Sequence, residues 1–135
     1  MILWNCRNPK IALTLFQYYI PDDKDRVEIG WGIYNWIKYN PDDCVTIIAI
    51  EDNRFCGFVF AHKEEEDLFI WQAKSTAGFK YSNLVFHILK CCAKDMGLKN
   101  IRLKADDKLA KFYARKYKFR PSIKGEMVYV LRDSF

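Results

Sequence analysis

Hydrophobic and polar positions divide the first forty residues into two helical segments. Apolar residues recur at helical spacing over 11–20, and Pro9 stands just before them, where proline favours the first position of a helix. A polar stretch at 21–25 interrupts this pattern. Apolar residues resume over 27–39, where two glycines weaken an otherwise helical pattern. The sequence therefore predicts two helices before residue 40.

The pattern changes to that of strands after residue 43. Apolar stretches at 44–50, 55–61 and 68–73 are separated by the polar turns 51–54 and 63–67. Short β-branched and aromatic stretches bounded by polar turns are typical of antiparallel hairpins. We expect three successive strands here, followed by a loop at 74–81.

A helix over 82–96 is the clearest element. One face of its helical wheel is apolar and the other is polar. The apolar face carries Val85, Ile88, Leu89, Cys92 and Met96, and the opposite face carries Asn83, His87, Lys90 and Lys94. Gly97 fits the position that ends a helix in the left-handed conformation.

The remaining pattern predicts a strand at 100–105, a helix from Asp106 or Asp107 to about Tyr117, and a strand at 127–131. The order is therefore α α β β β α β α β. A helix that connects the third and fourth strands acts as a crossover, so these two strands should be parallel neighbours. We expect a single α/β domain over residues 1–135, with a mixed central sheet flanked by helices on both faces.

Composition narrows the class of protein. The chain has 135 residues, of which 50% are hydrophobic and 29% charged, which favours a globular fold over disorder. No apolar stretch approaches the roughly 18 to 20 residues that a membrane helix needs. The five cysteines show no C-x-x-C spacing, so we expect reduced thiols, no metal site and a cytoplasmic location.

Charge is distributed unevenly along the chain. Residues 1–67 carry 7 Lys+Arg and 12 Asp+Glu, a net charge of −5, whereas residues 68–135 carry 15 and 5, a net charge of +10. A basic half attracts polyanions, phosphorylated ligands or acidic surfaces. A solvated basic face without a specific partner is the alternative interpretation.

Residues 44–131 resemble the GNAT superfamily of acyl-CoA-dependent N-acetyltransferases. One similarity is the strand Phe55-Cys56-Gly57-Phe58-Val59, and a second is the order of strand, loop and helix over 68–96. The third is the segment 110–119, Ala-Lys-Phe-Tyr-Ala-Arg-Lys-Tyr-Lys-Phe, which is similar to the A-x-x-F-Y-x-K-x-G-F close of the family.

The resemblance implies a GNAT-like fold, acetyl-CoA as co-substrate and an amine, on a small molecule or a protein, as acceptor. It implies that pantetheine lies beside the third strand and that the pyrophosphate lies at the N-terminus of the following helix, where unpaired N–H groups favour anions. The implied cofactor-binding residues are Ile70, Gln72, Ala73, Lys74, Gly78, Phe79, Lys80, Tyr81, Ser82 and Asp107. Tyr113 is the implied acid that protonates the leaving thiolate.

The chain departs from the family in two places. When the pattern R/Q-x-x-G-x-G/A is placed on residues 77–82, only Ser82 matches, because Ala77 and Lys80 replace the leading Arg/Gln and the central Gly. Counting back from Phe119 places Ala114 at the catalytic position, so Tyr113 takes that role with a shift of one residue. These departures favour a second hypothesis, a GNAT-like module without catalysis, as in some phage virion proteins.

Such a module would contact nucleic acid or an acidic protein through its basic half. The basic residues concerned are Lys90, Lys94, Lys108, Lys111, Arg115, Lys116 and Lys118. Phosphate contacts of this kind weaken steeply with salt. His62 is a candidate general base, and an exposed histidine without a role is the alternative. The acidic run 64–67 is a candidate site for a cationic acceptor, and a charged turn is the alternative.

Overall fold

The computed structural model describes residues 2–4, 7–17, 23–75, 81–123 and 125–131. The strands are β1 (Ile2–Trp4), β2 (Cys44–Glu51), β3 (Arg54–Glu64), β4 (Asp67–Ser75), β5 (Asn100–Lys104), β6 (Arg120–Pro121) and β7 (Glu126–Val130). The helices are α1 (Pro9–Gln17), α2 (Asp23–Tyr39), α3 (Ser82–Asp95) and α4 (Asp107–Tyr117), and a short 3-10 helix spans Pro41–Asp43. Within these ranges no helix is both long enough and apolar enough to cross a bilayer.

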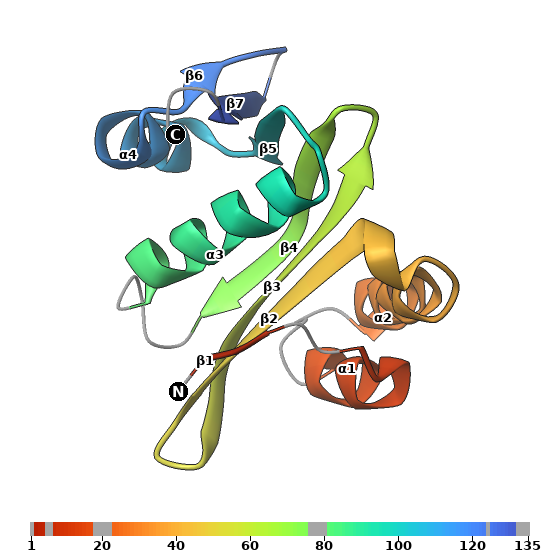
Figure 1. The fold of residues 1–135 in the computed structure, drawn as a ribbon. Coiled ribbons are helices and arrows are strands. Elements are labelled where there is room, and N and C mark those ends of the chain that lie inside the picture. The colour runs from red at the N-terminus through yellow and green to blue at the C-terminus, as the bar shows by residue number, and fades with distance from the viewer. Residues whose placement is uncertain (1, 5–6, 18–22, 76–80, 124, 132–135) are drawn as a thin grey trace.

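The strands of the described residues form one mixed sheet in the order β1-β2-β3-β4-β5-β7-β6 (Figure 1). The β4–β5 pair is parallel and the other pairs are antiparallel, which confirms the crossover predicted for the helix between them. The predicted order of elements is also confirmed. Strands β1 and β6 were not predicted, because three and two residues are too few to show a period of two.

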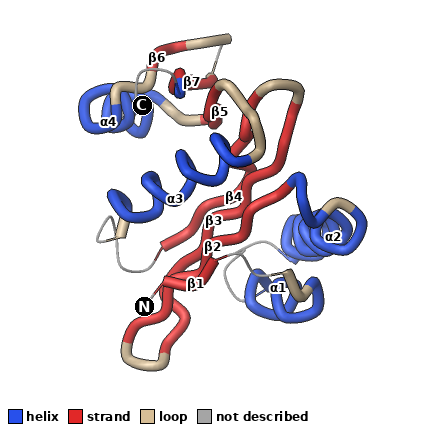
Figure 2. The backbone as a smooth tube through the Cα atoms, viewed as in Figure 1, coloured by secondary structure: helices blue, strands red, loops and turns tan. Residues whose placement is uncertain are grey.

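Helices cover the sheet from both sides, as predicted. Helices α1 and α2 lie against one face, and α3 lies against the other together with α4 (Figures 1 and 2). Strand β3 alternates between the two sides: Phe58 and Phe60 belong to the core under α1 and α2, whereas Val59 and Ala61 belong to the core under α3. The two faces are called the α2 face and the α3 face below.

Helix α3 largely follows its predicted wheel. Ile88 and Leu89 are buried, and Gly97 has the positive φ of 73° expected of the residue that ends a helix. Lys90 is a correction to the prediction, because it is half-buried and its ammonium lies 5.0 Å from the centre of the Phe86 ring. A lysine can cover an aromatic ring with its stem while its charge stays near water.

Strands β4 and β5 pair over only part of their length. The parallel register runs from Asp67, opposite Asn100, to Ile70, opposite Leu103. We call this paired stretch the closed end. Over residues 71–75, β4 does not pair with β5, and it pairs with β3 alone at 72–75, so the backbone groups on its other edge have no strand partner. We call this stretch the open end.

A bulge at Trp71 marks the boundary between the two ends. Phe60 pairs with Gln72 and Ala61 pairs with Ile70, so Trp71 is the extra residue on β4. Its indole packs beneath α2, where a Cβ built on Gly32 would lie 2.7 Å from a ring carbon of Trp71. A bulge places two successive side chains on one face. The glycine therefore gives the indole the room that this bulge requires.

The closed end is held by Arg102. Its guanidinium donates to Asp67 (Nε–Oδ2 3.1 Å), to both carboxylate oxygens of Glu126 (2.9 and 2.8 Å), and it lies 3.0 Å from Glu64. It also lies 4.6 Å from the centre of the Phe69 ring. The side chains of Arg102 and Glu126 are only 15% and 7% exposed, so solvent screens this group weakly.

Candidate functional site

A cavity of about 480 Å³ lies where β4 and β5 separate. Its walls come from β2, β3, β4, β5, α3 and α4. It is lined from the α3 face by Val59, Ala73 and Leu103, and from the α2 face by Phe58 and Lys74. The cavity therefore passes through the sheet at its open end, because residues from both faces border the same space.

On the α3 face the wall is mostly apolar. Ile70 and Leu103, the last paired residues of the closed end, lie beneath Val85 and Leu89 of α3. Ala73 is exposed even though its partner Val59 packs into the core. An apolar wall beside unpaired strand backbone suits an extended amide chain, because such a chain can hydrogen-bond to the strand and bury its methylenes.

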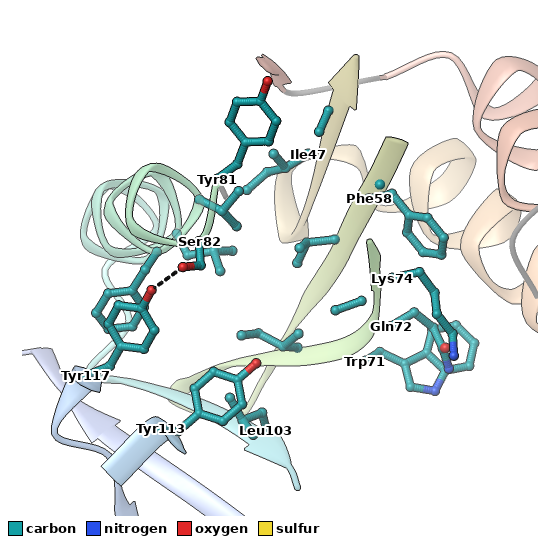
Figure 3. Close-up of a pocket in the computed structure, with 18 of the residues that line it drawn as sticks. Ile47, Phe58, Trp71, Gln72, Lys74, Tyr81, Ser82, Leu103, Tyr113 and Tyr117 are labelled. Atoms are coloured by element: carbon teal, nitrogen blue, oxygen red, sulfur yellow. Dashed lines mark hydrogen bonds between the residues drawn. The ribbon is translucent and has the colours of Figure 1, made fainter. Parts of the chain in front are cut away.

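Tyr113 enters this cavity from α4. Figure 3 shows its hydroxyl pointing into the space above Leu103. Within the described residues the hydroxyl forms no hydrogen bond. Burial, with a smaller contribution from Tyr117, raises the pKa of Tyr113 above its ordinary value of 10. A half-buried phenol that stays protonated can give a proton to an anion formed beside it.

The N-terminus of α3 is tied to the end of α4. The Tyr117 hydroxyl lies 2.6 Å from the Ser82 hydroxyl (Figure 3). It also lies 3.0 Å from Asn83 Oδ1. The Lys116 ammonium lies 3.3 Å from the same Ser82 hydroxyl. Lys116 therefore brings a positive charge to the first turn of α3, where the helix dipole already favours an anion.

The residues implied for the cofactor divide between the two faces. Ile70, Ala73, Tyr81 and Ser82 border the cavity from the α3 face. Gln72 and Lys74 border it from the opposite face: they pair with Phe60 and Phe58, and Figure 3 shows them beside Trp71. Gly78, Phe79 and Lys80 lie outside the described residues. Asp107 is the first residue of α4, and its side chain is also outside the described part.

The other candidates lie away from the cavity. The His62 ring stacks on Trp36 with 4.4 Å between ring centres and packs edge-on against Phe69. His87 is exposed, and its Nε2 lies 3.7 Å from the sulfur of Cys91. Neither histidine lines the cavity. Within the described residues, no group of three or more His, Cys, Asp or Glu side chains could hold a metal ion.

Three of the four residues of the acidic run form ion pairs. Glu64 and Asp67 bind Arg102, and Glu66 lies 3.2 Å from Lys99. This arrangement favours the structural interpretation of the run over a site for a cationic acceptor. The Arg102 network was not predicted, because its carboxylates come from positions far apart in the sequence.

Sequence reasoning also missed Lys104 and Tyr117. Lys104 ends β5 and lines the cavity, but an alternating strand pattern does not show which lysine stands at a gap. Tyr117 lies in the segment that resembles the family, four residues after Tyr113. That spacing places both tyrosines on one side of α4 and is the signal that could have found it.

No family model and no curated protein matches the chain. Solved structures do: an acetyltransferase of the GNAT family from Staphylococcus aureus has a TM-score of 0.72 and 16% identity, covering 97% of this chain and 98% of that one. An aminoglycoside 6′-acetyltransferase type Ii has a TM-score of 0.67 and 15% identity, covering 97% of both chains. PaiA N-acetyltransferase from Thermoplasma acidophilum, in complex with coenzyme A, has a TM-score of 0.58 and 13% identity, covering 95% of this chain and 96% of that one.

Proposed function

The chain has the fold of GNAT acetyltransferases, and we propose that it is an acyl-CoA-dependent N-acetyltransferase. We further propose that residues 1–135 form one domain and that the protein acts in the cytoplasm. The observation that carries the proposed activity is the cavity through the open end of the sheet. A thioester reaching it from the α3 face and an amine reaching it from the α2 face would meet beside Tyr113.

The α3 face fits coenzyme A as a substrate. Pantetheine would lie along the unpaired edge of β4 between Ile70 and Ala73, with its amides on the free backbone groups. Its pyrophosphate would lie at the first turn of α3, near Ser82 and Lys116. The positive charge of Lys116 would compensate in part for the glycines that residues 77–82 lack.

The reaction is a transfer of the acetyl group from sulfur to nitrogen. The amine nitrogen attacks the thioester carbonyl, a C–N bond forms and the C–S bond breaks. Tyr113 gives its proton to the departing thiolate, and the proton lost by the amine returns to Tyr113 through solvent in the cavity. The products are an N-acetyl amide and the free thiol of coenzyme A, so the proton balance closes. General acids placed in this way contribute about 10²- to 10⁴-fold to a rate.

Calorimetric titration with acetyl-CoA, and separately with coenzyme A, tests the proposal. We expect micromolar binding by the unmodified chain. In the Lys116→Glu variant we expect binding at least about tenfold weaker, because the new carboxylate would repel the phosphates. Lys94→Glu is the matched control, since Lys94 is exposed on the last turn of α3, at the opposite end of that helix from Ser82 and Lys116. No binding at millimolar ligand would contradict the proposed activity.

A GNAT-like module without catalysis remains the second candidate. The observation that favours it is the exposed basic side of α4, with Lys108, Lys111 and Arg115. Titration with a duplex oligonucleotide at several salt concentrations tests its nucleic-acid form. Binding that falls steeply with salt, in a chain that does not bind coenzyme A, would support this candidate over the enzyme.

A further inference from the structure

The α2 side of the cavity has a different chemical character from the α3 side. Phe58, Trp71, Gln72 and Lys74 border it from β3 and β4, and Figure 3 shows these four side chains gathered together. Because the proposed thioester occupies the α3 side, this is the side from which an acceptor would enter. Its residues therefore bear on which amine the protein accepts.

Lys104 belongs to the same side. Side chains two apart along a strand lie on one face, so Lys104 lies on the face of Arg102. Arg102 covers the Phe69 ring, and that ring contacts His62, which stacks on Trp36 of α2. Lys104 thus lines the cavity on the α2 side at the end of β5, as Lys74 does along β4.

Both lysines lack an ion-pair partner within the described residues. Neither the Lys74 ammonium nor the Lys104 ammonium forms a hydrogen bond there. The carboxylates of this face, Glu64, Asp67 and Glu126, all bind Arg102, and Glu126 does so although it pairs with Lys104 across β5 and β7. No described residue that lines the cavity is acidic. The side facing the acceptor is therefore aromatic and positively charged.

Two consequences follow for an approaching amine. A polycation would be repelled by the lysines, whereas an anionic group on the acceptor would form charge-assisted hydrogen bonds with them. The lysines also disfavour the charged form of an ammonium beside them. This lowers its pKa and favours the neutral nucleophile, although the described lining offers no carboxylate or imidazole as a base.

We propose that the acceptor is an amine that also carries an anionic group, a carboxylate or a phosphate, held by Lys74 and Lys104. This inference rests on the proposed function and names the substrate class of the same site. The group transfer is the one written above: the nitrogen of the anionic amine gains the acetyl group, and the thiol gains the proton.

Matched pairs of acceptors test it. Release of the coenzyme A thiol from acetyl-CoA is measured with phenylalanine against phenylalaninamide, and with glucosamine 6-phosphate against glucosamine. Spermidine represents the polycations. We expect the anionic member of at least one pair to have a kcat/KM at least about tenfold higher than that of its neutral partner, as a charged hydrogen bond implies. A preference for phosphate over carboxylate, or the reverse, identifies the source of the anion.

Two variants locate the effect. In Lys104→Gln and Lys74→Gln, we expect the ratio between pair members to fall toward one, mainly through a higher KM for the anionic amine. Lys94→Gln, on the far side of α3, should keep the ratio of the unmodified chain. Unchanged ratios in both cavity variants would overturn the proposal. Faster reaction with spermidine or with the neutral members would overturn it as well.

The titration with coenzyme A distinguishes an error in the acceptor class from an error in the proposed activity. If coenzyme A binds and no anionic acceptor reacts, the acceptor class is wrong while the proposed activity stands. If coenzyme A does not bind even at millimolar concentration, the proposed activity itself is wrong, and the acceptor class falls with it.

Discussion

The two ends of strand β4 meet strand β5 in different ways. At the closed end the strands share a parallel register and are joined by Arg102, which binds carboxylates from β3, β4 and β7. At the open end β4 continues without β5, and a cavity lined by Tyr113, Lys74 and Lys104 takes the place of backbone pairing. At the closed end the polar groups bind one another, whereas the open end leaves backbone and side-chain polar groups available to a ligand.

The difference shows how a gap in a sheet can be kept open. Unpaired strand edges tend to find partners, and buried backbone groups without hydrogen bonds are costly. The closed end fixes the position of β5, while the bulge at Trp71 and the indole beneath Gly32 fix the direction of β4 beyond it.

The largest expected change in stability comes from a substitution at the closed end. Arg102→Met should lower the free energy of unfolding by about 3 to 5 kcal/mol, because it leaves the buried carboxylate of Glu126 without its partner. Chemical denaturation measures this change. Lys99→Met is the control, since the pair of Lys99 with Glu66 is exposed and should contribute under about 1 kcal/mol. Equal stabilities of the two variants would show that Arg102 does not hold this end.

The next largest expected change is in kcat, from a substitution at the open end. Tyr113→Phe should lower kcat about 100-fold while the free energy of unfolding changes by less than about 1 kcal/mol, because only the hydroxyl that faces the cavity is lost. Steady-state kinetics and denaturation measure the two quantities. Tyr39→Phe, which removes a hydroxyl at the exposed end of α2 and away from the cavity lining, is the control and should keep the full kcat. A full rate in Tyr113→Phe would remove this tyrosine as the acid.

A smaller effect concerns the boundary between the ends. In Gly32→Ala the new methyl group would lie 2.7 Å from the Trp71 ring, so the indole must shift. Overpacking of about 1 to 3 kcal/mol, offset by a gain in helix propensity of about 1 kcal/mol, leaves a net loss of about 1 kcal/mol. Asn35→Ala, exposed on the same helix, should gain stability instead. Equal or higher stability in Gly32→Ala would show that the indole moves without cost.

The smallest effect is the alkaline dependence of stability. Burial raises the pKa of Tyr113 in the folded state, so its contribution to stability is complete below the unfolded value of 10 and is lost as pH rises through the folded pKa. Tyr113→Phe should therefore lose less stability than the unmodified chain between neutral pH and a pH above 10. Denaturation curves at both pH values measure the difference. Parallel losses in the two proteins would show that Tyr113 does not contribute to the alkaline transition.

Much of the fold could be predicted because it depends on local patterns. The apolar face of α3 and the turn between β2 and β3 are readable from neighbouring residues. In that turn Asp52 and Asn53 both take positive φ, as a two-residue hairpin requires. Chain connectivity then made β4 and β5 parallel neighbours. Of the site, the segment around Tyr113 and the position of Ser82 at the start of α3 could be found in the same way.

The sequence by itself thus determined the order of the elements, the crossover and the two apolar faces, because helical and strand periods are properties of adjacent residues. Only the tertiary structure decided where β4 and β5 separate and that Arg102 binds Glu64 and Asp67 of the acidic run. It also decided that Gln72 and Lys74 lie on the α2 face, whereas Ser82 lies on the α3 face. The reason is physical: a single bulge at Trp71 sets the register beyond it, and its position depends on packing against a helix more than thirty residues earlier.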